Sequence, residues 1–234
     1  MLSKVTIILM FATIGFGTGV AEAQRYTTHG RSVVRDPNFT FQKPVESWRE
    51  RKTKHVVMQQ RDYSCGAAAL ATLLRYYWGH NVNENMVLGV IENMLTDEEL
   101  LERSSEGLTM ADLESAAVKM GYKASVGEIK FSKLVESKVP VILVINLGGV
   151  NHFVVLRDIV GNCAFLADPL RGNTRVSTTT LQRTWVKNAI LVVAPGDETQ
   201  SYRSQMGVTA AERSEGYLNR QVIRRQITGV GTNR

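Results

Sequence analysis

The sequence has few of the residues that form metal sites and disulfide frameworks. Its 234 residues include only two cysteines, four histidines and five prolines. Three of the histidines, His29, His55 and His80, are scattered without the spacing of metal ligands. We therefore expect neither a metal site nor a bound cofactor. The chain also contains no internal repeat and no low-complexity tract.

Long apolar runs are equally scarce, and the most apolar one lies at the N-terminus. Residues 5–20 are mostly apolar, but they are fewer than the roughly 20 needed to span a bilayer and are diluted by glycine and threonine. Lys4 precedes this run, and Ala21-Glu22-Ala23 has the small-x-small pattern of a secretory cleavage site. We predict that residues 1–23 are a signal peptide, that the mature protein is periplasmic or secreted, and that it keeps no stable membrane anchor.

The charge is basic but not concentrated. The formal net charge is +6, from 28 Lys and Arg against 22 Asp and Glu. The basic residues are spread in small groups, and no DNA- or RNA-binding motif surrounds them. A nucleic-acid partner is therefore not expected.

The most informative stretch of the chain leads into Cys65. From Gly66 onward an apolar, helix-favouring run continues as far as Gly79, which can end a helix. Cys65 therefore falls in the first turn of a buried helix. Unpaired backbone N–H groups and a partial positive charge at that end stabilise a thiolate relative to a thiol. The position suits a nucleophile.

Two interpretations of the cysteines compete at this point. In a compartment that permits disulfides, Cys65 and Cys163 could pair, and Cys65 would then be structural. If they do not pair, a free thiol at a helix N-terminus has a chemical purpose. A buried, inert Cys65 is the third alternative, because free cysteine is often buried.

The region between Cys65 and Pro140 is predicted to form helices that pack in the core and carry no chemistry. Asn83 can cap a helix that continues to about residue 94, and the acidic residues 96–99 begin another turn or two. Thr109 is a capping candidate for residues 110–120, with Gly121 as the stop. Ser132 caps a short helix that ends near residue 138.

After Pro140 the sequence changes to short runs rich in β-branched residues. Two turns, Gly148-Gly149 and Gly161-Asn162, separate the first three runs and indicate antiparallel hairpins. A short helix over residues 180–187 precedes the last run. Helices followed by an antiparallel sheet indicate an α+β domain of two layers, with the N-terminal helices packed on the sheet. Strands are expected over residues 141–145, 152–156, 163–167, 175–177 and 189–193.

The flanks of this domain are polar. Residues 24–53 are predicted to form an N-terminal arm, irregular up to about residue 44 and with a short helix before residue 54. The domain itself is assigned to residues 54–195. Residues 196–234 read as a basic, solvated tail, with helix over about 209–226.

Three further residues complete a chemical set with Cys65. His152 begins a strand and can act as the base, and Asp168 ends the next strand of the same hairpin, where it can orient the imidazole. Gln59 can place its side-chain amide beside the Cys65 N–H as an oxyanion donor, with Gln60 as a competitor for that role. The alternatives are a satisfied core histidine at 152 and an Asp-Pro turn residue at 168.

These residues resemble a known family, the C39 bacterial peptidases. That family consists of papain-like cysteine peptidases that remove double-glycine leaders from secreted peptides. The resemblance implies a papain-like fold over about residues 54–194, with Cys65 as nucleophile, His152 as base, Asp168 as orienter and Gln59 as oxyanion donor. It rests on residues 59–70 and 152–156, Ala167-Asp168-Pro169 followed by Gly172, and Trp185.

One departure from that family bears on the substrate. Its best-known members are cytoplasmic domains of ABC exporters, whereas here a signal peptide precedes the domain and we expect no transporter segment. The chain is more similar to stand-alone exported forms, including those that accompany functional-amyloid secretion. We expect an exported cysteine endopeptidase acting on a protein or peptide, a secretion-system or amyloid component and cleavage after Gly-Gly being candidates. The alternatives are a non-catalytic binding or chaperone module and a cell-wall amidase.

Overall fold

The computed structural model of the chain describes residues 31–35, 40–44, 47–196 and 204–214. The chain divides into two compact units, residues 1–46 and 47–234. In the first unit, β1 (Arg31–Arg35) pairs with β2 (Thr40–Pro44) in antiparallel fashion, so the prediction of an irregular arm is wrong there. The predicted signal peptide, residues 1–23, lies outside the described residues.

Five helices open the second unit. They are α1 (Trp48–Thr53), α2 (Cys65–Tyr76), α3 (Glu84–Glu92), α4 (Asp97–Glu106) and α5 (Met110–Lys119). The side chains of Asn83 and Thr109 cap α3 and α5 as predicted, by accepting hydrogen bonds from Met86 N and Asp112 N. None of the helices in the described part of the chain is long and apolar enough to cross a membrane.

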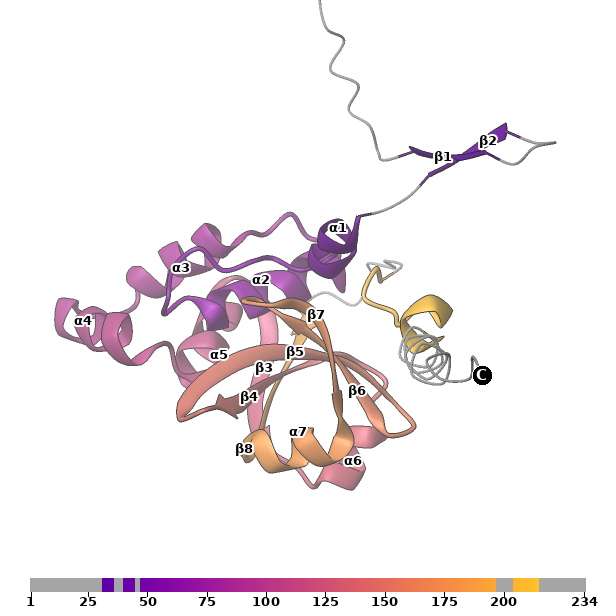
Figure 1. Ribbon diagram of the computed structural model, residues 1–234. Helices are drawn as coiled ribbons and strands as arrows, with labels where there is room; N and C mark the ends of the chain where they lie inside the picture. The colour runs from indigo at the N-terminus through magenta and orange to yellow at the C-terminus, as the bar shows by residue number, and fades with distance from the viewer. Residues whose placement is uncertain (1–30, 36–39, 45–46, 197–203, 215–234) are drawn as a thin grey trace, which may run out of the picture. The chain divides into compact units, whose positions relative to one another are not determined.

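The predicted antiparallel sheet follows, with six strands (Figure 1). Its order is β3-β8-β4-β5-β6-β7, and every neighbouring pair is antiparallel. Both predicted glycine turns join hairpins, β4 to β5 and β5 to β6. The strands are β3 (Tyr122–Glu128), β4 (Val141–Leu147), β5 (Val150–Val160), β6 (Cys163–Asp168), β7 (Gly172–Ser177) and β8 (Trp185–Pro195).

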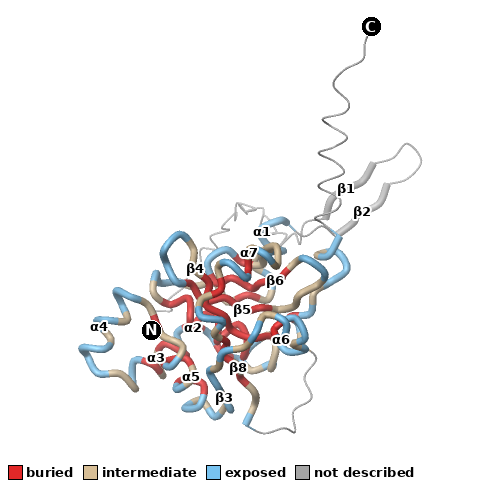
Figure 2. The backbone as a smooth tube through the Cα atoms, turned by 90° about the horizontal axis from the view of Figure 1, so that it is seen from below, coloured by how far each residue is buried: buried red, intermediate tan, exposed pale blue. Residues whose placement is uncertain are grey.

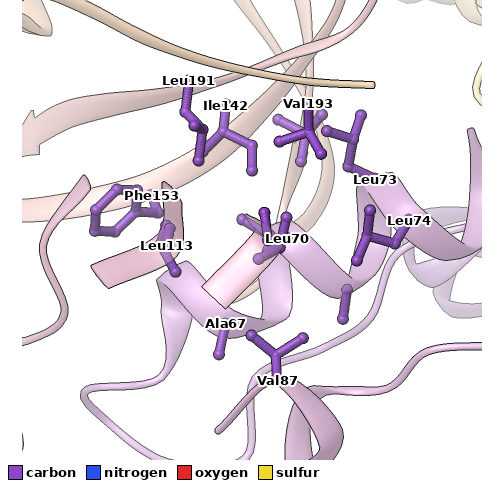
Figure 3. Packing of buried hydrophobic residues seen from close by; sticks show 14 of the residues in the cluster. Ala67, Leu70, Leu73, Leu74, Val87, Leu113, Ile142, Phe153, Leu191 and Val193 are labelled. Atoms are coloured by element: carbon purple, nitrogen blue, oxygen red, sulfur yellow. The ribbon is translucent and has the colours of Figure 1, made fainter. Parts of the chain in front are cut away.

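Both faces of the sheet are covered, so the predicted two layers are an incomplete description. On one face, leucines of α2 pack against Ile142, Leu191 and Val193, as Figure 3 shows. On the other, a second cluster contains Leu134 of α6 (Phe131–Val135) and Leu181 of α7 (Thr178–Thr184). Successive side chains of a strand point to opposite faces of the sheet, so neighbouring residues of each central strand belong to different clusters. The buried residues therefore run through α2 and the central strands (Figure 2).

Three local predictions in this region were wrong. β3 was missed because it is an edge strand with a largely exposed, weakly apolar pattern. Ser132 is not the cap of α6; the helix begins one residue earlier, at Phe131, whose ring packs 6.4 Å from that of Trp185. Trp185 itself belongs to β8 rather than to the preceding helix, where it is buried beside the second cluster.

The helix just before the predicted domain also packs on the sheet. Residues 47–53 cluster with the second unit. The side chain of Asn173 in β7 donates hydrogen bonds to the carbonyl oxygens of Arg51 and Lys54, and these bonds hold α1 against the sheet edge.

Residues 204–214 pack against the domain, which corrects the prediction of a solvated tail for this segment. Met206 is 1% exposed and joins the helix-facing core cluster. The buried guanidinium of Arg157 in β5 donates to the carbonyl oxygens of Met206 and Gly207 and pairs with Glu212 at 2.6 Å. This packing was not predicted, because one buried methionine and one ion pair leave almost no signal in the composition. Within the predicted helix 209–226, the described residues 210–214 are helical.

We predict that this segment contributes directly to the stability of the domain. Met206→Ala removes a fully buried side chain and should lower the free energy of unfolding by about 2–4 kcal/mol, measured by urea denaturation of the full chain. Ser214→Ala, an exposed position in the same segment, is the matched control and should change it by less than about 0.5 kcal/mol. Equal stabilities for Met206→Ala and wild type would contradict the observed packing.

Candidate active site

The structure places Cys65 as predicted, at the first residue of α2. The Oγ of the preceding Ser64 is occupied within the turn, where it accepts from Arg61 N and donates to Arg61 O. It makes no capping hydrogen bond to the helix. The first amides of α2 thus stay available beside the sulfur, where they can stabilise negative charge.

A glycine explains how closely the strand carrying His152 can approach Cys65. A side chain at Gly66 would meet Leu113 at 3.1 Å and Phe153 at 3.2 Å. Phe153 directly follows His152 in β5. The absence of a side chain at Gly66 therefore lets the start of α2 lie directly against β5 and α5.

His152 and Asp168 meet across the β5–β6 hairpin. The Nε2 of His152 lies 2.7 Å from Oδ1 of Asp168, and the two residues are 6% and 0% exposed. Asp168 is the last residue of β6 and His152 is close to the start of β5, so the antiparallel pairing brings their side chains together.

Cys65 also acts on His152, because its sulfur is among the groups that raise the pKa of the imidazole. Because Nε2 is bonded to Asp168, the other ring nitrogen is the one left for the sulfur. The structure therefore brings Cys65, His152 and Asp168 into one site, although they are far apart in the sequence.

The carboxylate of Asp168 has more partners than the imidazole alone. Its Oδ1 also accepts from the backbone N–H groups of Leu170 and Arg171, at 2.8 and 3.1 Å. Its Oδ2 accepts from Arg171 Nε at 2.7 Å. A fully buried carboxylate needs such a set of donors, because an unpaired buried charge is costly.

These contacts shift both ionisation equilibria. Burial alone lowers the pKa of His152, but hydrogen bonds and negative charge from Asp168 and Cys65 outweigh it and raise the pKa to about 9. Burial alone raises the pKa of Asp168, but the bond to His152 and its charge, together with Arg171 and Leu170 N–H, lower the pKa to about 2. The arrangement therefore favours an imidazolium next to a carboxylate at neutral pH.

Gln59 lies in the loop before Cys65 and is tied to the other side of the site. Its backbone N–H donates to the carbonyl oxygen of Pro169 at 2.9 Å, so it lies beside the turn that carries Asp168. One side-chain N–H donates to Arg61 O at 3.1 Å, and the side-chain oxygen is buried without a partner. Since the amide has two N–H bonds, the second is not committed by this contact.

The competitor Gln60 is held differently. Its side chain is exposed, whereas its backbone N–H donates to both carboxylate oxygens of Glu84, at 3.0 and 3.1 Å. Glu84 is only 1% exposed and anchors the loop from the first residue of α3. Neither Glu84 nor Arg171 was predicted to belong to the site. The sequence offered one signal for each: Glu84 follows the predicted helix cap Asn83, and Arg171 lies three residues after Asp168.

The sheet edge at Asp168 also requires a glycine. Gly172 pairs with Asp168 across β6 and β7 and has φ +75°. A Cβ there would lie 2.2 Å from the carbonyl oxygen of Lys52 in α1. The Gly172 noted in the sequence therefore permits both the turn beyond Asp168 and the close approach of α1.

The disulfide alternative is wrong, because Cys65 and Cys163 are both free. Cys163 begins β6, whereas Asp168, which belongs to the site, ends it. No group of three or more His, Cys, Asp or Glu residues that could hold a metal ion occurs within the described ranges. The site is thus composed of a thiol, an imidazole, a carboxylate and amide donors, which are the parts needed for acyl transfer to sulfur.

Comparison with known proteins places the chain in a family. The peptidase C39 family matches residues 53–198. A probable functional amyloid protease, FapD, from Pseudomonas fluorescens is 34% identical over 156 residues, covering 66% of this chain and 66% of that protein. The FapD protein of Pseudomonas aeruginosa is 34% identical over 66% of this chain and 67% of its own length. The chain thus spans about two thirds of the length of these relatives.

A solved structure shows the same fold. The peptidase domain of Streptococcus ComA, described as a bi-functional ABC transporter involved in quorum sensing, superposes with a TM-score of 0.51 at 22% identity. The alignment covers 60% of this chain and 97% of that domain. Because the family match extends over more than half of the chain, this protein belongs to the peptidase C39 family of papain-like cysteine peptidases.

Proposed function

We propose that the protein is an exported cysteine endopeptidase that hydrolyses peptide bonds through Cys65, His152 and Asp168. The observation that carries the proposal is the buried 2.7 Å bond between His152 and Asp168, in a site where Cys65 also acts on the pKa of the same imidazole. A binding module has no need to hold a free thiol, an imidazole and a buried carboxylate together.

The chemistry proceeds in two acyl-transfer steps. The Cys65 sulfur, as a thiolate, attacks the carbonyl carbon of the scissile bond, and negative charge develops on the carbonyl oxygen. The uncommitted N–H of Gln59 and the Cys65 backbone N–H serve as donors to that oxygen. His152 then gives its proton to the leaving amine, and a thioester remains on Cys65.

Hydrolysis of the thioester regenerates the enzyme. His152, now neutral, removes a proton from water, and the resulting hydroxide adds to the thioester carbonyl. Collapse of this intermediate breaks the carbon–sulfur bond, releases the new carboxyl terminus and returns the thiolate beside the imidazolium. Asp168 keeps the ring in one tautomer and orientation during both steps.

The substrate proposed here is an exported polypeptide. The relatives in two Pseudomonas species are named functional amyloid proteases, which favours a component of a functional-amyloid secretion system. Cleavage after Gly-Gly is the specificity that the family resemblance suggests testing first. Export itself rests on the apolar run and small-x-small pattern of residues 1–23.

Replacing the sulfur tests the proposal. Cys65→Ala should fold normally but cleave at least about 10³-fold more slowly than wild type, since no nucleophile remains. The measurement is mass-spectrometric detection of new termini in a library of synthetic peptides that includes Gly-Gly sequences. Cys163→Ala, which removes the other free thiol, is the matched control and should cleave like wild type.

Either of two results would contradict the proposal. One is cleavage by Cys65→Ala at the rate of wild type. The other is the absence of cleavage by wild type, both in this library and against exported amyloid subunits from functional-amyloid systems. Cleavage of muropeptides in place of peptides would instead indicate a cell-wall amidase.

The ion pair should also make stability depend on pH. His152 has a pKa of about 9 in the folded chain against 6.5 as its ordinary value, so its contribution is complete below pH 6.5 and is lost as the pH rises through 9. Asp168 has a pKa of about 2 against 3.8, so its contribution is complete above pH 3.8 and is lost as the pH falls through 2.

We therefore expect the difference in unfolding free energy between wild type and His152→Gln to be largest between about pH 4 and 6.5. It should shrink steadily as the pH is raised toward 9. Urea denaturation of both proteins across this range measures it. A difference that grows above pH 7 would show that the imidazole is held neutral in the folded protein.

A further inference from the structure

The residue that completes the environment of Asp168 is Arg171, which lies outside the proposed catalytic set. Arg171 belongs to the turn between β6 and β7, residues 169–171. Its Nε donates to Asp168 Oδ2 at 2.7 Å, whereas His152 bonds to Oδ1 of the same carboxylate. Two cationic side chains thus share one carboxylate, and each uses a different oxygen.

The two oxygens are held by independent means. Oδ1 accepts from His152 and from the backbone N–H groups of Leu170 and Arg171, which any side chain at residue 171 other than proline would leave in place. Oδ2 accepts from the guanidinium of Arg171. The side chain of Arg171 can therefore change the charge at the carboxylate without being needed to aim Oδ1 at the imidazole.

The exposure of the three side chains differs in a way that suits such a role. Asp168 is fully buried and the side chain of His152 is 8% exposed, but that of Arg171 is 44% exposed. Because the guanidinium of Arg171 is partly in contact with water, its charge is partly screened. It therefore weakens the effect of the Asp168 carboxylate on the imidazole without cancelling it.

We propose that Arg171 is a positioning residue that acts on His152 through Asp168: it holds Oδ2 and takes up part of the carboxylate charge that would otherwise act on the imidazolium. The catalytic value of this effect rests on the proposed peptidase function, whereas the effect of Arg171 on His152 can be measured without peptide cleavage. The consequence is that the imidazolium stays acidic enough to give its proton to the leaving amine.

The direction of the effect follows from the charges around the imidazole. His152 is acted on by Asp168 from β6 and Cys65 from α2, and Asp168 in turn by His152 and Arg171. Removing the positive charge of Arg171 leaves Asp168 more strongly negative toward the ring. The imidazolium is then stabilised, and the pKa of His152 rises further.

A titration that requires no turnover tests this. The pKa of His152 is measured by NMR of the ring in wild type and in Arg171→Gln, where the expected change is a rise of about half a unit or more. Arg171→Lys keeps the charge and should stay within about 0.3 units of wild type. Arg183→Gln removes the same charge from an exposed position in α7 and is the matched control, which should leave the pKa unchanged.

Activity supplies a second readout if wild type cleaves peptides. Arg171→Gln should move the basic limb of the pH profile of kcat/KM upward by the same amount as the pKa of His152, and kcat should fall several-fold because the acid is weaker. A residue with only a structural role would lower the rate without moving the limb.

An unchanged or lowered pKa of His152 in folded Arg171→Gln would overturn the inference. Arg171→Met is the second neutral variant if Arg171→Gln does not fold, with the same expected rise. Absence of peptide cleavage by wild type would remove the proposed function alone, because the NMR titration still reports the link from Arg171 to His152.

Discussion

The bond between His152 Nε2 and Asp168 Oδ1 is the constraint on which the rest of the site depends. It fixes which ring nitrogen remains for Cys65, and it requires a carboxylate that stays charged while fully buried. That requirement explains the turn after β6, in which two backbone amides and one guanidinium converge on Asp168. The sheet supplies the remaining condition, because the antiparallel pairing of β5 and β6 brings these two side chains together.

The site joins two halves of the domain, and a few backbone contacts set their relation. Cys65 comes from the helical half and the other two residues from the sheet. The bond from Gln59 N–H to Pro169 O connects the loop before Cys65 to the turn after Asp168, and Glu84 anchors the same loop from α3. Gly66 and Gly172 allow the close approaches on either side. The site therefore depends also on Glu84, Gly66 and Gly172, which have no chemical role themselves.

Local signals in the sequence predicted much of this fold. Asn83 and Thr109 cap helices because their side chains accept bonds from backbone amides nearby in the chain, and the glycine turns define the hairpins for the same local reason. The features that were missed depend on contacts distant in sequence or on position in the sheet. Met206 is buried in the core cluster, and Arg157, 49 residues away, binds its carbonyl oxygen. Arg171 gains significance only through its contact with a carboxylate whose other partner is His152.

The central claim is that Cys65 is activated by His152, and the rate of Cys65 alkylation measures this most directly. Iodoacetamide is applied to the native full chain at about pH 6, and modification of Cys65 and Cys163 is followed separately by mass spectrometry. Since the thiolate is the reactive form, Cys65 in wild type should react at least about tenfold faster than Cys65 in His152→Ala, with Cys163 unchanged between the two. A Cys65 that resists the reagent in the native protein, or that reacts equally fast without His152, would contradict the account.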